Sequence, residues 1–150
     1  YDFLMSKSYV DGKRIGVHGW SYGGFMTISL MTRYPGKFKA AVAGGPVTDW
    51  SMYEIMYTER YMDTPQQNPE GYKKASTFNY IDNLSGPMLL IHGTSDDVVV
   101  WQQSLNYIQS CVSKGKQIDY FVYPGHKHNV LGKDRVHLIR KIADYFEEKL

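Results

Sequence analysis

The chain has one cysteine, no long apolar run and little net charge, and each of these features excludes a class of protein or partner. Cys111 is its only cysteine, so no disulfide can form within the 150 residues. Cysteine usage therefore does not indicate whether the chain works in an oxidising or a reducing compartment. The longest apolar runs, such as Met88–Ile91, have the length of a strand and fall far short of a membrane span. Seventeen basic and fifteen acidic residues leave a net charge of only +2, which disfavours a nucleic-acid groove. We therefore expect no nucleic-acid partner and no membrane span, but a small or peptide substrate.

The composition is that of a globular protein. Hydrophobic residues make up 43% of the chain and charged residues 21%, and 150 residues suit one domain, 1–150, with one core. The chain opens at Tyr1 with neither an initiator Met nor the basic and then apolar pattern of a secretion signal. We expect it to be a piece of a longer polypeptide.

Apolar strand patterns alternate with helical ones along the chain. The pattern predicts strands over 14–18, 38–43, 88–92 and 118–123, and helices over 25–34, 101–113 and 135–149. The polar stretch 66–71 lies in an excursion between the second and third strands. This order predicts an α/β fold, with a mostly parallel sheet between helices on both faces, in three layers.

The segment Gly19-Trp20-Ser21-Tyr22-Gly23 fits the Gly-x-Ser-x-Gly nucleophile elbow of α/β-hydrolases, since a strand precedes it and a helix follows. There Ser21 would be the nucleophile and the Tyr22 backbone N–H an oxyanion donor. Gly19 and Gly23 would give the backbone room to close, and Gly24 would ease helix packing. The five residues alone are equally compatible with a plain glycine-rich turn.

A serine nucleophile needs a base and an acid, which follow it in that fold in the order Ser, acid, His. Asp96 and Asp97 come just after the third predicted strand, and His126 and His128 after the fourth. Parallel strands place their sites at these carboxyl ends. The spacing predicts an acid and a base here, but it does not choose within either pair.

The histidines also allow other interpretations. His126 and His128 are two residues apart, so both rings can reach one side of a metal, but no third Cys or His lies nearby and we predict no metal site. His18, His92 and His137 lie in or beside predicted strands and a helix, and we interpret them as structural.

Trp50, Tyr53 and Tyr57 recur at three- and four-residue spacing, so in a helix they would share one face. Such a stripe is usually core, and the pattern alone favours that interpretation. The stripe nevertheless begins just past the second strand, where with Tyr22 it would form a rigid apolar slot beside Ser21. A slot of this kind suits a compact ring such as proline.

Three separated segments together carry a resemblance: 19–24 (Gly-Trp-Ser-Tyr-Gly-Gly), 57–62 (Tyr-Thr-Glu-Arg-Tyr-Met) and 92–97 (His-Gly-Thr-Ser-Asp-Asp). The chain resembles the prolyl oligopeptidase family over essentially its whole length. More narrowly, it is similar to the dipeptidyl peptidase IV branch, which includes bacterial prolyl tripeptidyl aminopeptidases.

The resemblance implies a serine peptidase that needs no cofactor and acts on peptides with proline near the N-terminus. It implies Ser21 as the nucleophile that forms the acyl-enzyme, Asp96 rather than Asp97 as the acid, and His128 rather than His126 as the base. It also implies a proline pocket, which would consist of Tyr22, Val47, Trp50, Tyr53, Tyr57 and Val99.

One departure concerns the length of the released peptide. Dipeptidyl peptidases of this branch usually have Asn directly after the Asp pair, whereas this chain has Val98. The segment 98–101 looks more like the tripeptidyl enzymes. Release of two or of three residues therefore stays open.

A second departure is what the chain does not contain. Family members carry an N-terminal β-propeller that grips the free amino group, the first hydrolase strands, and a Tyr hydroxyl as second oxyanion donor. We expect the chain to be the C-terminal part of the peptidase domain, with little activity alone, and its parent to be an exported bacterial enzyme, periplasmic or on the cell surface. The unpaired edge at 14–18 predicts self-association as a homo-oligomer.

Two other functions are compatible with the same fold. An esterase or lipase would have a broad acyl pocket and no preference for proline. A non-catalytic binding scaffold would keep the fold and use its exposed faces for partners.

Overall fold

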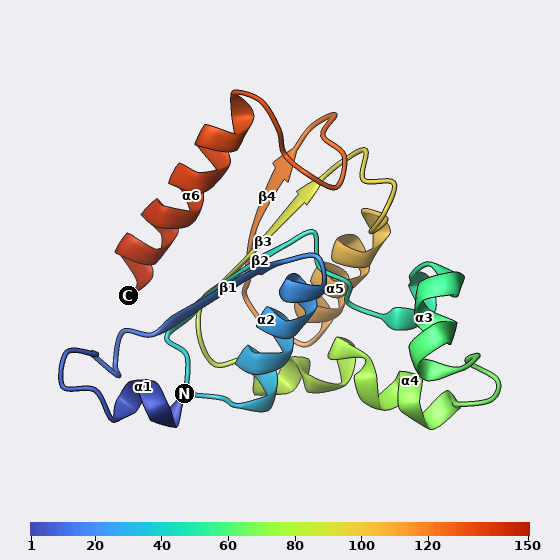
Figure 1. Cartoon of the computed structure of the whole chain (residues 1–150), viewed down its shortest axis with the longest axis horizontal. Coiled ribbons are helices and arrows are strands. Elements are labelled where there is room, and N and C mark those ends of the chain that lie inside the picture. The colour runs from blue at the N-terminus through green and yellow to red at the C-terminus, as the bar shows by residue number, and fades with distance from the viewer.

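A parallel sheet of four strands forms the centre of the computed structural model, which describes all residues, 1–150 (Figure 1). The strands lie side by side in chain order: β1 (Gly16–Trp20), β2 (Ala40–Gly44), β3 (Met88–Gly93) and β4 (Asp119–Tyr123). All three neighbouring pairs are parallel, so the carboxyl ends of all four strands lie at one edge of the sheet. β1 and β4 are the outer strands.

Helices make every connection between the strands. The short α1 (Asp2–Met5) precedes β1, and the remaining helices are α2 (Tyr22–Arg33), η1 (Trp50–Met52), α3 (Ile55–Met62), α4 (Pro69–Ala75), η2 (Thr77–Asn83), α5 (Gln102–Ser113) and α6 (Asp134–Lys149); η1 and η2 are 3-10 helices. No helix has both the length and the apolar character needed to cross a membrane.

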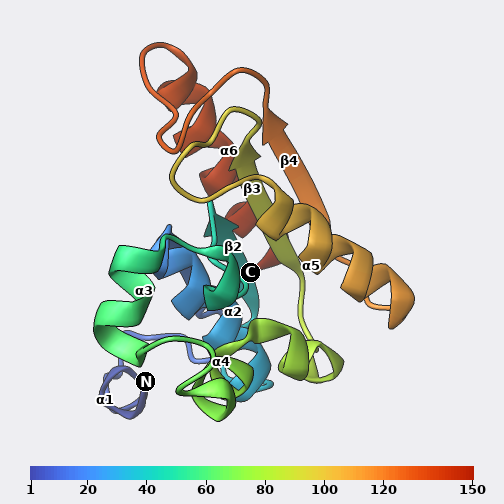
Figure 2. The ribbon, with the colours of Figure 1, turned by 90° about the vertical axis from the view of Figure 1, so that its right-hand side faces the viewer.

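The two faces of the sheet bury separate clusters, since successive side chains of a strand point to opposite faces. Ala41 and Ala43 of β2 pack with Ile28 of α2 and Tyr107 of α5. Val42 points the other way, into a cluster with Leu138, Ile142 and Tyr145 of α6. Figures 1 and 2 show α6 on one face of the sheet and α2 and α5 on the other. The predicted three-layer α/β architecture is confirmed.

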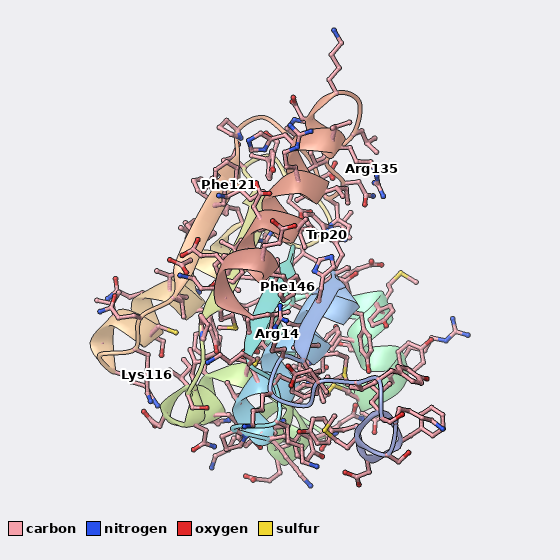
Figure 3. All side chains as sticks on the ribbon, turned by 90° about the vertical axis from the view of Figure 1, so that its left-hand side faces the viewer. Arg14, Trp20, Lys116, Phe121, Arg135 and Phe146 are labelled. Atoms are coloured by element: carbon pink, nitrogen blue, oxygen red, sulfur yellow. The ribbon has the colours of Figure 1, made fainter.

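Glycine in the strands lets aromatic rings approach the sheet closely. A Cβ at Gly16 would lie 2.5 Å from the Phe146 ring of α6, and one at Gly44 would overlap the Trp20 ring. Phe146, Trp20 and Phe121 border the cluster beneath α6 (Figure 3). Trp20 and Gly44 are partners at the end of the β1–β2 register, and the Trp20 ring occupies the space that a side chain at Gly44 would fill.

The element boundaries differ from the prediction by one to three residues, and the largest differences lie around Ser21. The first strand is shifted by two residues, to Gly16–Trp20, and α2 begins directly after Ser21. The excursion between β2 and β3 is largely helical, and Trp50 and Tyr57 lie in two different helices, η1 and α3. The expectation of one shared helix face for the aromatic stripe is therefore wrong, because the chain turns between η1 and α3.

Close packing at the start of α2 depends on glycine at two of the three positions expected. A Cβ at Gly19 would overlap the Gly23 carbonyl, and one at Gly24 would lie 2.7 Å from the Gly44 carbonyl oxygen and 2.9 Å from the Pro46 Cα. A Cβ at Gly23 would have nothing within 4 Å. Gly19 and Gly24 are thus required by space, whereas Gly23 is not.

These distances give opposite predictions for two neighbouring substitutions. Gly24→Ala should lower the free energy of unfolding by about 1–3 kcal/mol, because the backbone of Gly44 and Pro46 cannot yield without distorting the sheet edge. Gly23→Ala should raise it by about 0.5–1 kcal/mol, because alanine loses less backbone entropy in a helix. Urea unfolding of the 150-residue chain measures both; equal effects of the two substitutions would contradict this packing.

Candidate active site

Ser21 has a strained backbone between β1 and α2. Its φ is 62° and its ψ −118°, a combination that non-glycine residues rarely adopt and that typically costs about 1–3 kcal/mol. The Ser21 N–H donates to the Gly44 carbonyl at 2.8 Å, which holds the turn against the end of β2. The hydroxyl does not cap α2, so the helix does not use it.

Tyr22 is the first residue of α2 and follows the strained turn. The first N–H groups of a helix have no partner within it, and the helix dipole favours negative charge at this end. An oxygen that becomes negative beside Ser21 would therefore find a donor in the Tyr22 N–H, at the position the sequence predicts.

Backbone contacts join the loop after β3 to the loop after β4. The Ser95 N–H donates to the His126 carbonyl at 2.9 Å, and the Thr94 N–H to the Tyr123 carbonyl at 3.1 Å. Gly93 allows this approach, because a Cβ there would overlap the His126 carbonyl. The two loops bring Asp96 and His128 together although 32 positions separate them.

Asp96 and His128 form a hydrogen-bonded pair. His128 Nδ1 lies 2.8 Å from Asp96 Oδ2, and the amides of Val98 and Val99 donate to Asp96 Oδ1 at 3.0 and 2.9 Å. The Asp96 side chain is only 1% exposed and that of His128 14%. Since Oδ2 of an ionised carboxylate only accepts, His128 carries its proton on Nδ1, and Nε2 has no hydrogen-bond partner.

The surroundings of Asp96 keep it ionised. Burial alone would raise its pKa, but the hydrogen bonds from His128, His92 and the amides of Val98 and Val99 hold the pKa well below its usual range. A negative charge is therefore fixed on the side of the imidazole that carries Nδ1.

The alternatives that the spacing left open have other partners. Asp97 Oδ2 lies 2.7 Å from Lys127 Nζ in an exposed ion pair, and His126 Nε2 lies 2.8 Å from Asp134 Oδ2. The structure thus pairs Asp96 with His128, whereas Asp97 pairs with Lys127 and His126 with Asp134. The two histidines engage different carboxylates instead of facing one point.

Trp20, the residue before the nucleophile candidate, links the elbow to His128. Its indole Nε1–H donates to the His128 carbonyl at 2.8 Å. Gly45, with φ +44°, leaves room for this contact, since a Cβ there would lie 3.3 Å from both His128 Cε1 and Trp20 Nε1. Ser21 makes no hydrogen bond to His128 in this structure, and such bonds are often long before substrate binds.

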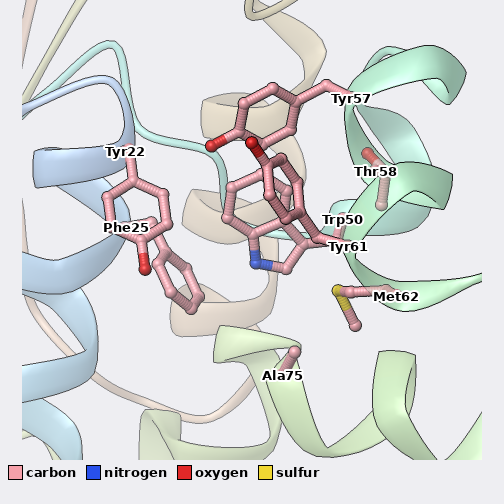
Figure 4. Close-up of a pocket in the computed structure, with 8 residues that line it drawn as sticks. All are labelled: Tyr22, Phe25, Trp50, Tyr57, Thr58, Tyr61, Met62 and Ala75. Carbon is pink, nitrogen blue, oxygen red and sulfur yellow. The ribbon is translucent and has the colours of Figure 1, made fainter.

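An aromatic cavity of about 540 Å³ opens between α2 and α3 (Figure 4). The Trp50 ring stacks on Tyr57 at 6.0 Å and lies 5.9 Å from the Tyr22 ring. Seven of the eight residues that line it are hydrophobic: Tyr22, Phe25, Trp50, Tyr57, Thr58, Tyr61, Met62 and Ala75. One wall of the cavity is the ring of Tyr22, the residue that follows Ser21.

The six residues predicted for a proline pocket have different places. Tyr22, Trp50 and Tyr57 line the cavity, while Tyr53 meets the Trp50 and Tyr57 rings edge-on. The other two, Val47 and Val99, are buried in the cluster that supports Trp50. The structure thus gathers all six in one region.

Several residues of this site were not predicted from the sequence. Phe25, Thr58, Tyr61, Met62 and Ala75 line the cavity without having been predicted. The spacing of four between Tyr57 and Tyr61 was a usable signal for a further aromatic on the same helix face. Trp20 contacts His128 across 108 positions, which no local pattern indicates. His92 lies only four residues before Asp96 and contacts its carboxylate, but its place in a predicted strand favoured a purely structural role.

The lowered pKa of Asp96 predicts a pH-dependent cost for Asp96→Asn. Ionised Asp96 stabilises the fold above the ordinary aspartate pKa of about 3.9, and this contribution is lost as the pH falls through the lower folded-state pKa. The substitution should cost about 1–3 kcal/mol near pH 7 and less near about pH 3.

Asp97→Asn is the matched control, because it removes only an exposed partner of Lys127 and should change stability little. Urea unfolding at the two pH values measures both variants. A cost of Asp96→Asn that is small, or the same at both pH values, would contradict the ionised buried pair.

Comparison with known proteins places the whole chain in one family. The model of the prolyl oligopeptidase family matches residues 1–150. An Aspergillus oryzae protein named as a dipeptidyl-aminopeptidase B is 43% identical over 128 residues, which cover 83% of this chain and 14% of that protein. The chain therefore spans about a seventh of the length of such relatives.

Solved structures agree in fold. A Bacteroides ovatus protein named as a dipeptidyl aminopeptidase IV is 58% identical with a TM-score of 0.98, over 99% of this chain and 21% of that one. Porphyromonas gingivalis dipeptidyl peptidase 4 is 38% identical with a TM-score of 0.91, over 95% of this chain and 20% of that one. The family match over every residue, with these two likenesses, shows that the chain belongs to the prolyl oligopeptidase family.

Proposed function

We propose that the chain carries the catalytic residues of a serine peptidase that cleaves after proline and releases short N-terminal peptides. Ser21 is the nucleophile, His128 the general base and Asp96 the acid that orients it. The observation that carries the proposal is the buried Asp96–His128 pair, which the Trp20 indole ties to the strained turn at Ser21.

In the acylation step, Ser21 Oγ attacks the scissile carbonyl carbon while its proton passes to His128 Nε2. Asp96 stabilises the resulting imidazolium through Nδ1–H. The Tyr22 N–H donates to the oxygen that becomes negative, and one such donor is typically worth about 10²–10³ in rate. The carbon–nitrogen bond then breaks, and His128 returns the proton to the leaving amine.

Deacylation repeats these roles with water. His128 Nε2 takes a proton from a water molecule, whose oxygen attacks the acyl carbon on Ser21. The bond to Oγ breaks, the proton returns to Ser21, and the peptide that ends in proline leaves. No step needs a metal or a cofactor.

The aromatic cavity supports proline as the residue on the acyl side. Tyr22 contributes both its backbone N–H to the proposed oxyanion site and its ring to the cavity wall, so a bound side chain would lie next to the reacting carbonyl. Rigid aromatic walls suit a compact apolar ring. The name of the relatives, dipeptidyl aminopeptidase, supports release from the N-terminus, and whether two or three residues leave stays open.

We further propose that the chain works as the C-terminal part of a longer polypeptide. The relatives are several times longer than 150 residues, which supports this view. The grip on the substrate's amino group and a second oxyanion donor would then come from other segments. Kinetic experiments therefore use the longer polypeptide.

Ser21→Ala in that polypeptide should abolish labelling by a fluorophosphonate probe and lower kcat by about 10⁴-fold or more, because no other group can form the acyl bond. Gel fluorescence after labelling, with circular dichroism to confirm folding, measures this. Ser51→Ala is the control, since that hydroxyl serves only the Asp49 cap of η1. Labelling that survives Ser21→Ala would disprove the assignment.

Substrate choice separates a peptidase from an esterase of the same fold. We expect kcat/KM for Ala-Pro-p-nitroanilide or Ala-Ala-Pro-p-nitroanilide to exceed that for the Ala-Ala analogue by about 10-fold or more, because only proline matches a rigid slot. Comparison of the two prolyl substrates gives the length of the released peptide. Fast hydrolysis of p-nitrophenyl butyrate without a preference for proline would favour the esterase.

A further inference from the structure

Asp96 has a second imidazole partner, His92, at the end of β3. The His92 ring is fully buried, and its Nε2 lies 3.1 Å from Asp96 Oδ2 and 2.8 Å from the Val99 carbonyl oxygen. Its Nδ1 lies 2.7 Å from Ser104 Oγ of α5. We propose that His92 and Ser104 are positioning residues that hold the Asp96 carboxylate in the orientation that His128 requires. This rests on the proposed function.

The partners of His92 determine where its proton lies. A carboxylate oxygen and a backbone carbonyl only accept hydrogen bonds, so Nε2 is the protonated nitrogen and donates to both Asp96 and Val99. Ser104 Oγ has no hydrogen-bond partner other than His92 Nδ1, so its hydroxyl donates to that nitrogen. The neutral ring therefore satisfies every contact, and Ser104 fixes the tautomer.

With His92 in place, the Asp96 carboxylate receives four donors. Oδ1 accepts from two amides of its own loop, and Oδ2 accepts from His92 and His128. The donors come from the end of β3, the loop after it and the loop after β4. Because they approach from different directions, they prevent rotation of the carboxylate, and α5 anchors the network through Ser104.

Without His92, Oδ2 would keep His128 as its only donor in a site closed to water, since the Asp96 side chain is 1% exposed. A buried carboxylate that loses a donor is poorly solvated and turns toward any remaining donor. His128 would then lose its fixed orientation toward Ser21. A misplacement on the order of 1 Å costs about 10²-fold in rate.

Loss of His92 also changes the electrostatics of the base. The Nε2–H dipole of His92 directs positive charge at Asp96, so its removal makes the electrostatic potential at the His128 ring more negative. The other groups near this carboxylate are Tyr53 and the exposed Asp97–Lys127 pair, and these stay unchanged in the variants below. The acid limb of the kcat/KM profile should therefore move to higher pH, a shift that a merely structural residue would not cause.

The test uses two substitutions of His92 in the longer polypeptide. His92→Phe fills the ring volume without a donor, and it should lower kcat by about 10- to 100-fold with KM within about twofold, and move the acid limb upward. His92→Gln restores an N–H donor near the Nε2 position and should recover most of kcat and return the acid limb toward its original pH. Ser104→Ala should give a smaller loss in the same direction. His126→Phe is the control, since His126 pairs only with an exposed carboxylate, Asp134.

The outcomes separate this proposal from the proposed function. Unchanged kcat and acid limb in His92→Phe, or equal losses in His92→Phe and His92→Gln, would overturn the role of His92 while the peptidase stands. If the unmodified protein shows neither labelling nor turnover, the proposed function fails. The ¹⁵N-labelled imidazole resonances then still test the network, with the His128 Nδ1–H signal expected to lose protection from exchange in His92→Phe.

If His92→Phe does not fold, Ser104→Ala and His92→Gln provide the test instead. An unchanged acid limb in Ser104→Ala would then count against the role of His92 and Ser104.

Discussion

The buried carboxylate of Asp96 is the point on which the site depends. A charge that is closed off from water survives only if donors surround it, and the Asp96 side chain finds them in two amides and two imidazoles. These donors come from segments that meet only when β3 and β4 lie parallel and in register. The fold and the charge therefore support each other: the sheet brings the donors together, and the donors tie together the loops at the edge of the sheet.

The strained turn at Ser21 depends on the same edge. Its amide is held by the Gly44 carbonyl, and the space for Trp20 exists because positions 44 and 45 have no side chain. The Trp20 indole then reaches the carbonyl of His128. Trp20 therefore connects the end of β1 with the loop after β4, although β1 and β4 are the two outer strands of the sheet. Trp20 therefore links the strained turn at Ser21 to the loop that carries His128.

Much of this was predictable from local pattern and order. Ser21 followed from a glycine-bounded turn between strand and helix, and the positions of an acid and a base followed from the ends of two later strands. The choice between Asp96 and Asp97 did not follow from spacing, because it depends on which side chain the Val98 and Val99 amides turn inward. The roles of Trp20 and His92 rest on contacts between strands and loops, and those contacts exist only in the folded chain. The aromatic stripe does not lie on one helix because Asp49 caps the short helix η1 and also accepts from Ser76, and because the backbone at Tyr53 is extended, so η1 ends before α3 begins.

We propose that Ser21, His128 and the Tyr22 amide face one reacting carbon beside the aromatic cavity. A crystal structure of the longer polypeptide with a peptide that ends in a proline boronic acid tests this most directly. We expect a covalent bond from Ser21 Oγ to boron, a hydrogen bond that the Tyr22 N–H donates to a boronate oxygen, and the proline ring against Tyr22 and Trp50. Boron bound to another residue, or a proline ring outside the cavity, would contradict it.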